Sequence, residues 1–178
     1  MSQYMNLMGK NAKQASLEKI NTKIKNKVLK RYASLLDKEK NSILKANAID
    51  IKFSLKKKLK KNLIDRLTID QKILNNIKNS INNIAKLKDP VDNILEKWGR
   101  PNGLKIKRVS IPIGVIGVIY ESRPNVTSDV ASLCFKSGNA VILKGGSEAI
   151  NTNKILAKLF RKALKENKVN ENFIQFID

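Results

Sequence analysis

The sequence predicts an α/β protein in which a helical region precedes part of a parallel, doubly wound sheet. Residues 1–100 contain only two glycines and one proline, so long helices can run through them. Further along the chain, two apolar runs rich in β-branched residues, 115–120 and 140–143, bracket a segment with helical spacing. Strand, helix and strand in this order indicate parallel strands joined by a crossover. We therefore expect a helical scaffold in residues 1–100 and a strand arm with a partial sheet unit in residues 101–178.

Three segments of the first region carry apolar residues at spacings of three and four, which places them on one face of a helix. The first face comprises Ile24, Val28, Tyr32, Leu35 and Leu36. The second comprises Leu44, Ala48, Ile51 and Leu55. The third comprises Ile69, Ile73, Ile77, Ile81 and Ile84. We expect each face to pack against a neighbouring helix. Thr68 opens a capping-box pattern at the start of the third segment.

The second region changes period. Apolar and charged residues alternate over residues 104–113, which predicts an exposed strand or a hairpin arm. Residues 115–120 are apolar except for Gly117, a pattern typical of a strand buried on both faces, and we expect Gly117 to allow close packing. A helix should follow over about residues 127–137. Residues 173–177 should begin a third strand.

The formal net charge of +21 indicates an anionic partner, and a basic nucleic-acid or polyanion-binding module is one interpretation of the chain. Most of the excess lies in residues 1–100, which hold 24 Lys and Arg against nine Asp and Glu. AT-rich codons encode Lys, Asn and Ile, so a gene rich in A and T would give the same charge without selection for an anionic partner. With 5% aromatic residues the chain offers few platforms for stacking bases, so a nucleic-acid partner is disfavoured.

The chain has one cysteine, Cys134, and no histidine. An intrachain disulfide and a histidine base or metal ligand are therefore excluded, and no metal site is predicted. Cys134 lies mid-helix between Leu133 and Phe135, so we interpret it as a small core residue. No apolar run reaches the roughly 20 residues of a membrane span, and the first residues lack a signal-peptide core. A cytoplasmic protein is expected.

Lys144, Gly145, Gly146, Ser147 and Glu148 follow the second apolar run and precede a long amphipathic segment. Glycines let a ligand approach the backbone, and the next helix would point its free amides at that ligand. Lys144 and the Ser147 hydroxyl can hold a phosphate or a ribose, with Ser147 also serving as the helix N-cap. The alternative is a turn that exists for packing alone.

Residues 121–125 form the expected loop at the end of the first apolar run. Arg123 can clamp a carboxylate or phosphate, and Asn125 can donate its amide to an oxyanion. The alternative is that Arg123 pairs with Glu121, while Pro124 and Asn125 only shape a turn.

The segment IPIGVIGVIYESRPNVTSDVASLCFKSGNAVILKGGSEAI resembles the gamma-glutamyl phosphate reductases (glutamate-5-semialdehyde dehydrogenases) of the aldehyde dehydrogenase superfamily. GKNAKQAS, ILKANAIDI, LIDRL and KDPV extend the resemblance over nearly the whole chain. It implies an aldehyde dehydrogenase-like fold with a Rossmann-like cofactor domain. It also implies NADPH-dependent reduction of L-glutamyl 5-phosphate to L-glutamate 5-semialdehyde in proline biosynthesis. A functional link to glutamate 5-kinase and a homo-oligomeric complete enzyme are further implications.

The resemblance also assigns site residues. Lys144 matches the superfamily lysine that contacts the adenosine ribose or its 2′-phosphate, and Gly145, Gly146, Ser147 and Glu148 fall on the turn beside it. NADP follows from the family, whereas Glu148, displaced by one position, leaves NADP and NAD open. Asn125 lies near the superfamily asparagine of the oxyanion hole. Family members are more than twice as long and carry their catalytic cysteine in the second half, so this chain should be the N-terminal portion and inactive alone.

Overall fold

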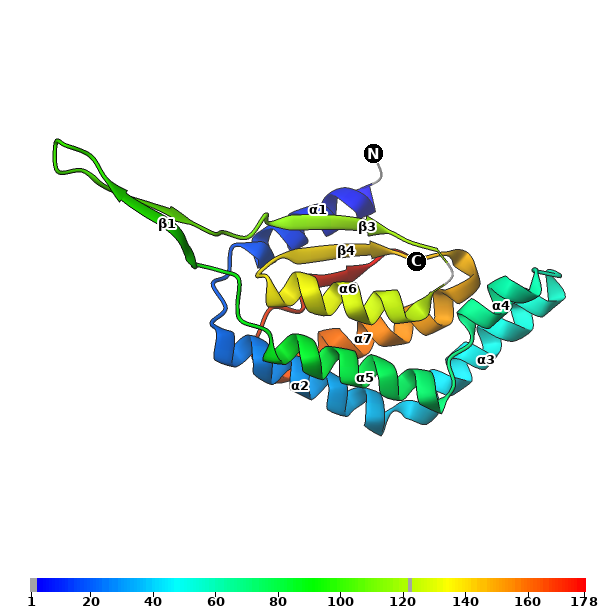
Figure 1. Ribbon diagram of the computed structural model, residues 1–178. Coiled ribbons are helices and arrows are strands. Elements are labelled where there is room, and N and C mark those ends of the chain that lie inside the picture. The colour runs from blue at the N-terminus through cyan, green and yellow to red at the C-terminus, as the bar shows by residue number, and fades with distance from the viewer. Residues whose placement is uncertain (1–2, 122) are drawn as a thin grey trace.

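The computed structural model describes residues 3–121 and 123–178 as a three-stranded parallel sheet with helices on both faces and a projecting hairpin (Figure 1). The sheet strands are β3 (Val115–Ile119), β4 (Ala140–Lys144) and β5 (Ile174–Phe176), in the order β3-β4-β5. β4 pairs in parallel with both neighbours, as the strand–helix–strand pattern predicted. The two connecting helices are α6 (Pro124–Lys136) and α7 (Ile150–Glu166).

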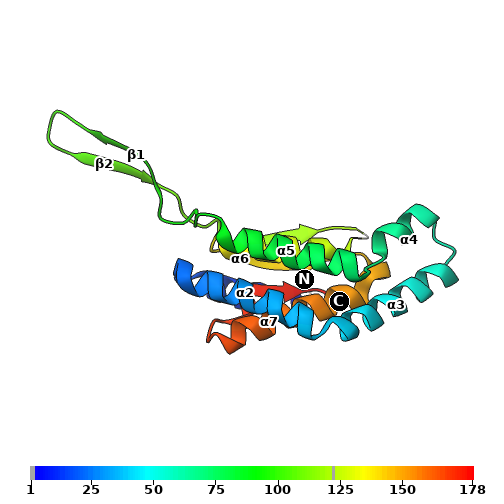
Figure 2. The same ribbon diagram turned by 60° about the horizontal axis from the view of Figure 1, so that its bottom comes forward.

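Helices cover the sheet in layers (Figures 1 and 2). The remaining helices are α1 (Gln3–Ser16), α2 (Thr22–Lys38), α3 (Lys40–Lys56), α4 (Lys61–Leu67) and α5 (Gln71–Lys86). Short 3-10 turns, η1 (Ser147–Ala149) and η2 (Glu171–Phe173), precede α7 and β5. α1 lies on one face of the sheet and α6 and α7 on the other, with α2 and α5 forming an outer layer against them. Among the described residues, no helix is both long and apolar enough to cross a membrane.

The first and third predicted apolar faces are confirmed, because both turn into the core. Tyr32 on α2 is fully buried and its ring centroid lies 4.4 Å from that of Phe160 on α7. Phe135 on α6 meets Phe160 edge-on at 5.9 Å and Phe173 at 5.5 Å, which joins the helical layers to the sheet. Ile81 on α5 is equally buried. The N-cap of α5 is Asp70, whose carboxylate accepts from the Ile73 amide at 2.7 Å, and the prediction of Thr68 as cap was wrong.

The predicted apolar face of α3 was wrong. Ala48 and Leu55 are exposed, and the buried residues are Ile43, Asn47, Asp50 and Ser54. Three of these four are polar, so apolar periodicity could not reveal the face. Asn47 accepts from the Ile69 amide and donates to the Leu67 carbonyl, both at 2.8 Å, which pins the α4–α5 connection. α3 is therefore fixed to the rest of the chain by polar contacts as well as by the buried Ile43.

Strand β3 lies at an edge of the sheet and not in its interior. Ile119 is 87% exposed, so the expectation of burial on both faces was wrong for this strand. Gly117 also differs from the prediction, because a Cβ there would meet no atom within 4 Å. β4 is the more enclosed strand, because Ala140, Val141 and Leu143 are fully buried.

The predicted arm is an antiparallel hairpin that projects from one end of the body (Figure 2). It pairs β1 (Ile94–Gly99), which the sequence did not reveal, with β2 (Lys105–Val109). Asp89 anchors its base by accepting both from Lys25 on α2 at 3.0 Å and from the Val91 amide at 3.1 Å.

Candidate functional site

Lys144 ends the middle strand β4, where a doubly wound sheet places its ligands. Its Nζ donates to the backbone oxygen of Asp178 at 2.9 Å. Lys154 on α7 contacts the carboxylate of the same Asp178 at 2.6 Å. Two lysines thus approach one end of the sheet, and only Lys144 belongs to a strand.

The two glycines after Lys144 lie close to the protein's own side chains. A Cβ on Gly145 would overlap the amide nitrogen of Asn153 and come within 3.1 Å of the Tyr120 ring. A Cβ on Gly146 would overlap the carboxylate of Glu148, which folds back over the turn. The packing role left open by the sequence therefore holds for Gly145, whereas at Gly146 the nearest neighbour is the end of the flexible Glu148 side chain. The turn places a carboxylate and an exposed Ser147 hydroxyl beside Lys144.

The start of α7 differs from the prediction of a Ser147 N-cap. Ser147 begins the 3-10 turn η1, and α7 starts at Ile150. The N-cap residue of neither element accepts a hydrogen bond through its side chain. Instead Asp50 of α3 accepts from the backbone amides of Asn151 at 3.2 Å and Thr152 at 2.8 Å. Because these two amides already donate to Asp50, they are not free to bind a ligand, contrary to the prediction for the start of this helix.

A hydrogen-bonded chain links the end of β3 to α7, whose Asn153 packs against Gly145 of the turn after β4. The Tyr120 and Thr127 hydroxyls lie 2.6 Å apart, and Thr127 donates to the Asn153 side chain at 2.9 Å. Burial raises the pKa of Tyr120, against the opposing effect of the Thr127 hydrogen bond, so the phenol stays neutral. The two segments with predicted site residues are thereby held in one fixed relation.

Helix α6 begins at Pro124, three residues before the predicted start, because proline is well suited to the first helical position. Asn125 consequently lies in the first turn of the helix and not in a loop. Its Nδ2 donates to Asp129 one turn later at 3.3 Å. Ser122, also in the predicted loop, lies outside the described residues. Within the described part of the chain the Arg123 guanidinium makes no ion pair, so the alternative pairing with Glu121 is not formed; Arg123 contacts Glu121 through its backbone amide.

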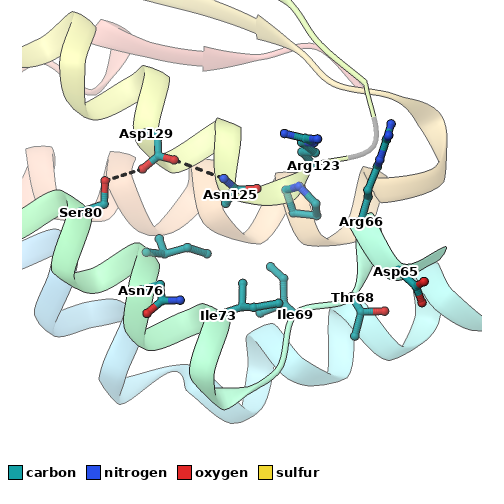
Figure 3. A pocket seen from close by; sticks show the side chains of 12 residues that line it. Asp65, Arg66, Thr68, Ile69, Ile73, Asn76, Ser80, Arg123, Asn125 and Asp129 are labelled. Atoms are coloured by element: carbon teal, nitrogen blue, oxygen red, sulfur yellow. Dashed lines mark hydrogen bonds between the residues drawn. The ribbon is translucent and has the colours of Figure 1, made fainter. Parts of the chain in front are cut away.

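Arg123, Asn125 and Asp129 open onto a groove of about 460 Å³ between α6 and the α4–α5 pair (Figure 3). Arg66 of α4 and Ser80 of α5 line its other side. The sequence did not single out Arg66 or Ser80 as site residues. Both lie far from α6 along the chain: the packing of α5 on α6 brings Ser80 to it, and Arg66 arrives with α4, which packs on α3.

Cys134 is confirmed as a core residue. Its side chain is 8% exposed, and burial raises the pKa of its thiol to about 11. A thiol in this state is a poor nucleophile at neutral pH.

Helices on both faces of a parallel sheet, with a projecting hairpin, define the class of fold. No family model matches the chain. A solved structure of a Bacillus subtilis protein described as a putative aldehyde dehydrogenase superposes with a TM-score of 0.70 at 15% identity, over 98% of this chain and 36% of that one. The fold is therefore aldehyde dehydrogenase-like.

Within that class, the similarity to one kind of enzyme is much greater. The chain is 46% identical to the gamma-glutamyl phosphate reductase of Thermodesulfovibrio yellowstonii, over 95% of this chain and 41% of the relative. The crystal structure of the Thermotoga maritima gamma-glutamyl phosphate reductase superposes with a TM-score of 0.92 at 41% identity, over 96% of this chain and 42% of that one. The homologues of this chain are gamma-glutamyl phosphate reductases, which confirms the resemblance. The chain spans about two fifths of the length of the curated relatives that it matches.

Proposed function

We propose that this chain is the N-terminal part of an NADPH-dependent reductase that converts L-glutamyl 5-phosphate to L-glutamate 5-semialdehyde in proline biosynthesis. The observation that carries the proposal is the 46% identity to gamma-glutamyl phosphate reductases over nearly the whole chain. In this proposal residues 1–100 are the scaffold, and residues 101–178 supply the arm and the cofactor-binding unit. A cytoplasmic homo-oligomer, supplied with substrate by glutamate 5-kinase, is part of the same proposal.

The residues around Lys144 fit the adenosine end of a nicotinamide dinucleotide. Lys144 brings a cation to the carboxyl end of the middle strand, and Ser147 adds an exposed hydroxyl. Gly145 and Gly146 keep the turn close to the strand, while Glu148 brings an acceptor suited to a ribose hydroxyl. We assign these five residues to cofactor binding. The bound cofactor would supply the hydride, and our choice of NADP follows from the resemblance to the family.

Arg123 and Asn125 are proposed for the substrate side. The Arg123 guanidinium is exposed and can form paired hydrogen bonds to a phosphate or carboxylate. Asn125 donates one amide hydrogen to Asp129, and its second amide hydrogen remains available for an oxyanion. Both project from the start of α6, so a rigid element fixes their relative position.

Cys134 cannot serve as the nucleophile of an acyl transfer, because its thiol is enclosed in the core. It is the one cysteine of the sequence. We therefore expect no reductase turnover from the 178-residue chain by itself. Turnover by the purified chain that Cys134→Ser abolishes would contradict this assignment.

The proposal is tested by measuring NADPH binding to the 178-residue chain in a fluorescence titration. Lys144→Ala should weaken binding roughly tenfold, the effect of losing one charge-assisted contact. Lys154→Ala is the matched control, because it also removes a lysine that contacts Asp178, and it should bind as the parent does. NADH in parallel titrations measures the preference for the 2′-phosphate.

A polyanion-binding module would give the opposite pattern. Its affinity for duplex DNA would fall steeply with salt and would not change in Lys144→Ala. That result, together with no NADPH binding, would overturn the proposal.

A further inference from the structure

The groove between α6 and the α4–α5 pair has opposite charges at its two ends (Figure 3). Asp129 and Ser80 lie at one end, and Arg66 lies toward the other with Arg123. Between them the lining includes the apolar side chains of Ile69 and Ile73. A ligand that fills the groove must therefore carry a cation and an anion separated by a short apolar chain.

The carboxylate of Asp129 is held in place by neutral donors. Ser80 donates to one oxygen at 2.9 Å and the Asn125 amide donates to the other at 3.3 Å. Within the described ranges no lysine or arginine nitrogen lies within ion-pair distance of Asp129. A half-buried carboxylate that accepts from two neutral donors has further lone pairs for a cationic partner.

The arginine end has the complementary property. Neither Arg66 nor Arg123 forms an ion pair within the described residues, although Asp65 stands next to Arg66 in the chain. Both guanidinium groups are exposed and come from different elements, α4 and the turn before α6. Two unpaired arginines on one groove attract a carboxylate or a phosphate.

We propose that this groove recognises the amino-acid part of the substrate, with Asp129 binding the α-ammonium group and Arg66 and Arg123 binding an anionic group of the same molecule. The inference rests on the proposed function and explains how the enzyme would select its substrate. Asp129 would distinguish an α-amino acid derivative from an acyl phosphate without an amino group. Asn125 then stands between the bound ammonium and the arginines. Ser80 acts as a positioning residue that fixes the carboxylate of Asp129.

The experiment is isothermal titration of the 178-residue chain with L-glutamate and with glutarate, which lacks the amino group. L-glutamate should bind roughly tenfold more tightly than glutarate, because only it can pair with Asp129. Asp129→Asn should remove that difference without weakening the binding of glutarate. Asp65→Asn, a carboxylate lost from the same groove beside Arg66, is the matched control and should retain the preference for L-glutamate.

Three further measurements separate the possible failures. Ser80→Ala should weaken the binding of L-glutamate more than that of glutarate. Because this substitution leaves the charge of the groove intact, it distinguishes the positioning role of Ser80 from the effect of the Asp129 charge. Competition by inorganic phosphate tests the arginine end of the groove: a phosphate that displaces glutarate occupies the same arginines. NADPH titration of Asp129→Asn should match the parent, which shows a folded chain and tests the proposed function separately.

Equal affinity for L-glutamate and glutarate, or the same loss in Asp65→Asn as in Asp129→Asn, would overturn the inference. So would the absence of L-glutamate binding in a chain that binds NADPH. A chain that binds neither NADPH nor L-glutamate would count against the proposed function as well.

Discussion

The carboxylate of Asp50 caps helix α7 through Thr152, accepting from its backbone amide at 2.8 Å and from its hydroxyl at 2.6 Å. The second carboxylate oxygen accepts from the Asn151 amide and side chain. Asp50 belongs to α3, about a hundred residues earlier in the chain, so an element distant in sequence completes this helix terminus. The cap also stabilises the turn that carries Lys144, because α7 follows that turn directly.

Asp50→Ala should lower the free energy of unfolding by about 3 kcal/mol. The substitution leaves the Asn151 amide, the buried Thr152 amide and the Thr152 hydroxyl without their charged acceptor. Hydrogen bonds to charged groups contribute about 1.5–3 kcal/mol. Urea unfolding followed by circular dichroism measures the effect. Asp37→Ala is the control, because Asp37 is a 59% exposed helical carboxylate paired with Lys78, and it should change stability by less than about 1 kcal/mol. Similar losses in both variants would contradict the capping role.

The pair of Lys25 and Asp89 should make stability depend on pH. Burial would raise the pKa of Asp89, but hydrogen bonds from Lys25, the Val91 amide and Thr22 outweigh it and hold the pKa below its ordinary value. The folded chain thus binds this proton less readily than the unfolded chain. The contribution to stability is complete above the unfolded pKa and is lost as pH falls through the folded pKa, in the window below about pH 4.

Asp89→Asn should therefore be less stable near neutral pH, by about 3 kcal/mol, because the ammonium of Lys25 is 2% exposed and loses its partner. The difference from the parent should shrink as pH is lowered toward about 2. Unfolding curves at several pH values measure it, and Lys25→Met combined with Asp89→Asn gives the coupling energy of the pair. A difference that stays constant with pH would show that Asp89 acts without its charge.

Apolar patterning was sufficient for much of the fold. The isoleucine stripe of α5 and the run 140–143 each point to one buried surface, and both occur as predicted. The failure at α3 has one physical cause: polar residues that are buried because a distant segment satisfies them. In the sequence Asp50 resembles a solvent-facing residue, and only the packing of α7 on α3 explains its burial.

The candidate site divides in the same way. Lys144 and the Arg123–Asn125 segment could be found from sequence, since they follow predicted strands along the chain. Arg66 and Ser80 could not, because they reach the groove only through the packing of α4 on α3 and of α5 on α6. No local pattern around them differs from a solvated helix face. Gly117 shows the opposite error, in which a local signal had no structural counterpart.

Gly145→Ala should destabilise the chain by about 2 kcal/mol and weaken NADPH binding. The added methyl group would overlap the Asn153 side chain, which is buried and held by Thr127, so neither the turn nor Asn153 can move without breaking that contact. Thermal unfolding and NADPH titration measure the two effects. Gly117→Ala is the control: the position is exposed, lies in strand β3 and has open space for a methyl group, so stability should be unchanged or slightly higher. Equal behaviour of the two variants would contradict the close packing of the turn.

Cys134 should resist thiol reagents in the folded chain. With a pKa of about 11 its thiolate fraction at pH 8 is roughly one in a thousand, and its side chain is almost enclosed. Reaction with 5,5′-dithiobis(2-nitrobenzoic acid) should therefore be slow in buffer and fast in denaturant. The matched control is Leu133→Cys combined with Cys134→Ala, which moves the thiol to the neighbouring position, where the native side chain is 49% exposed on the same helix. The control should react rapidly without denaturant. If Cys134 in the parent chain reacts as fast as the thiol at position 133, the core assignment fails, and with it the argument that this chain has no accessible nucleophile.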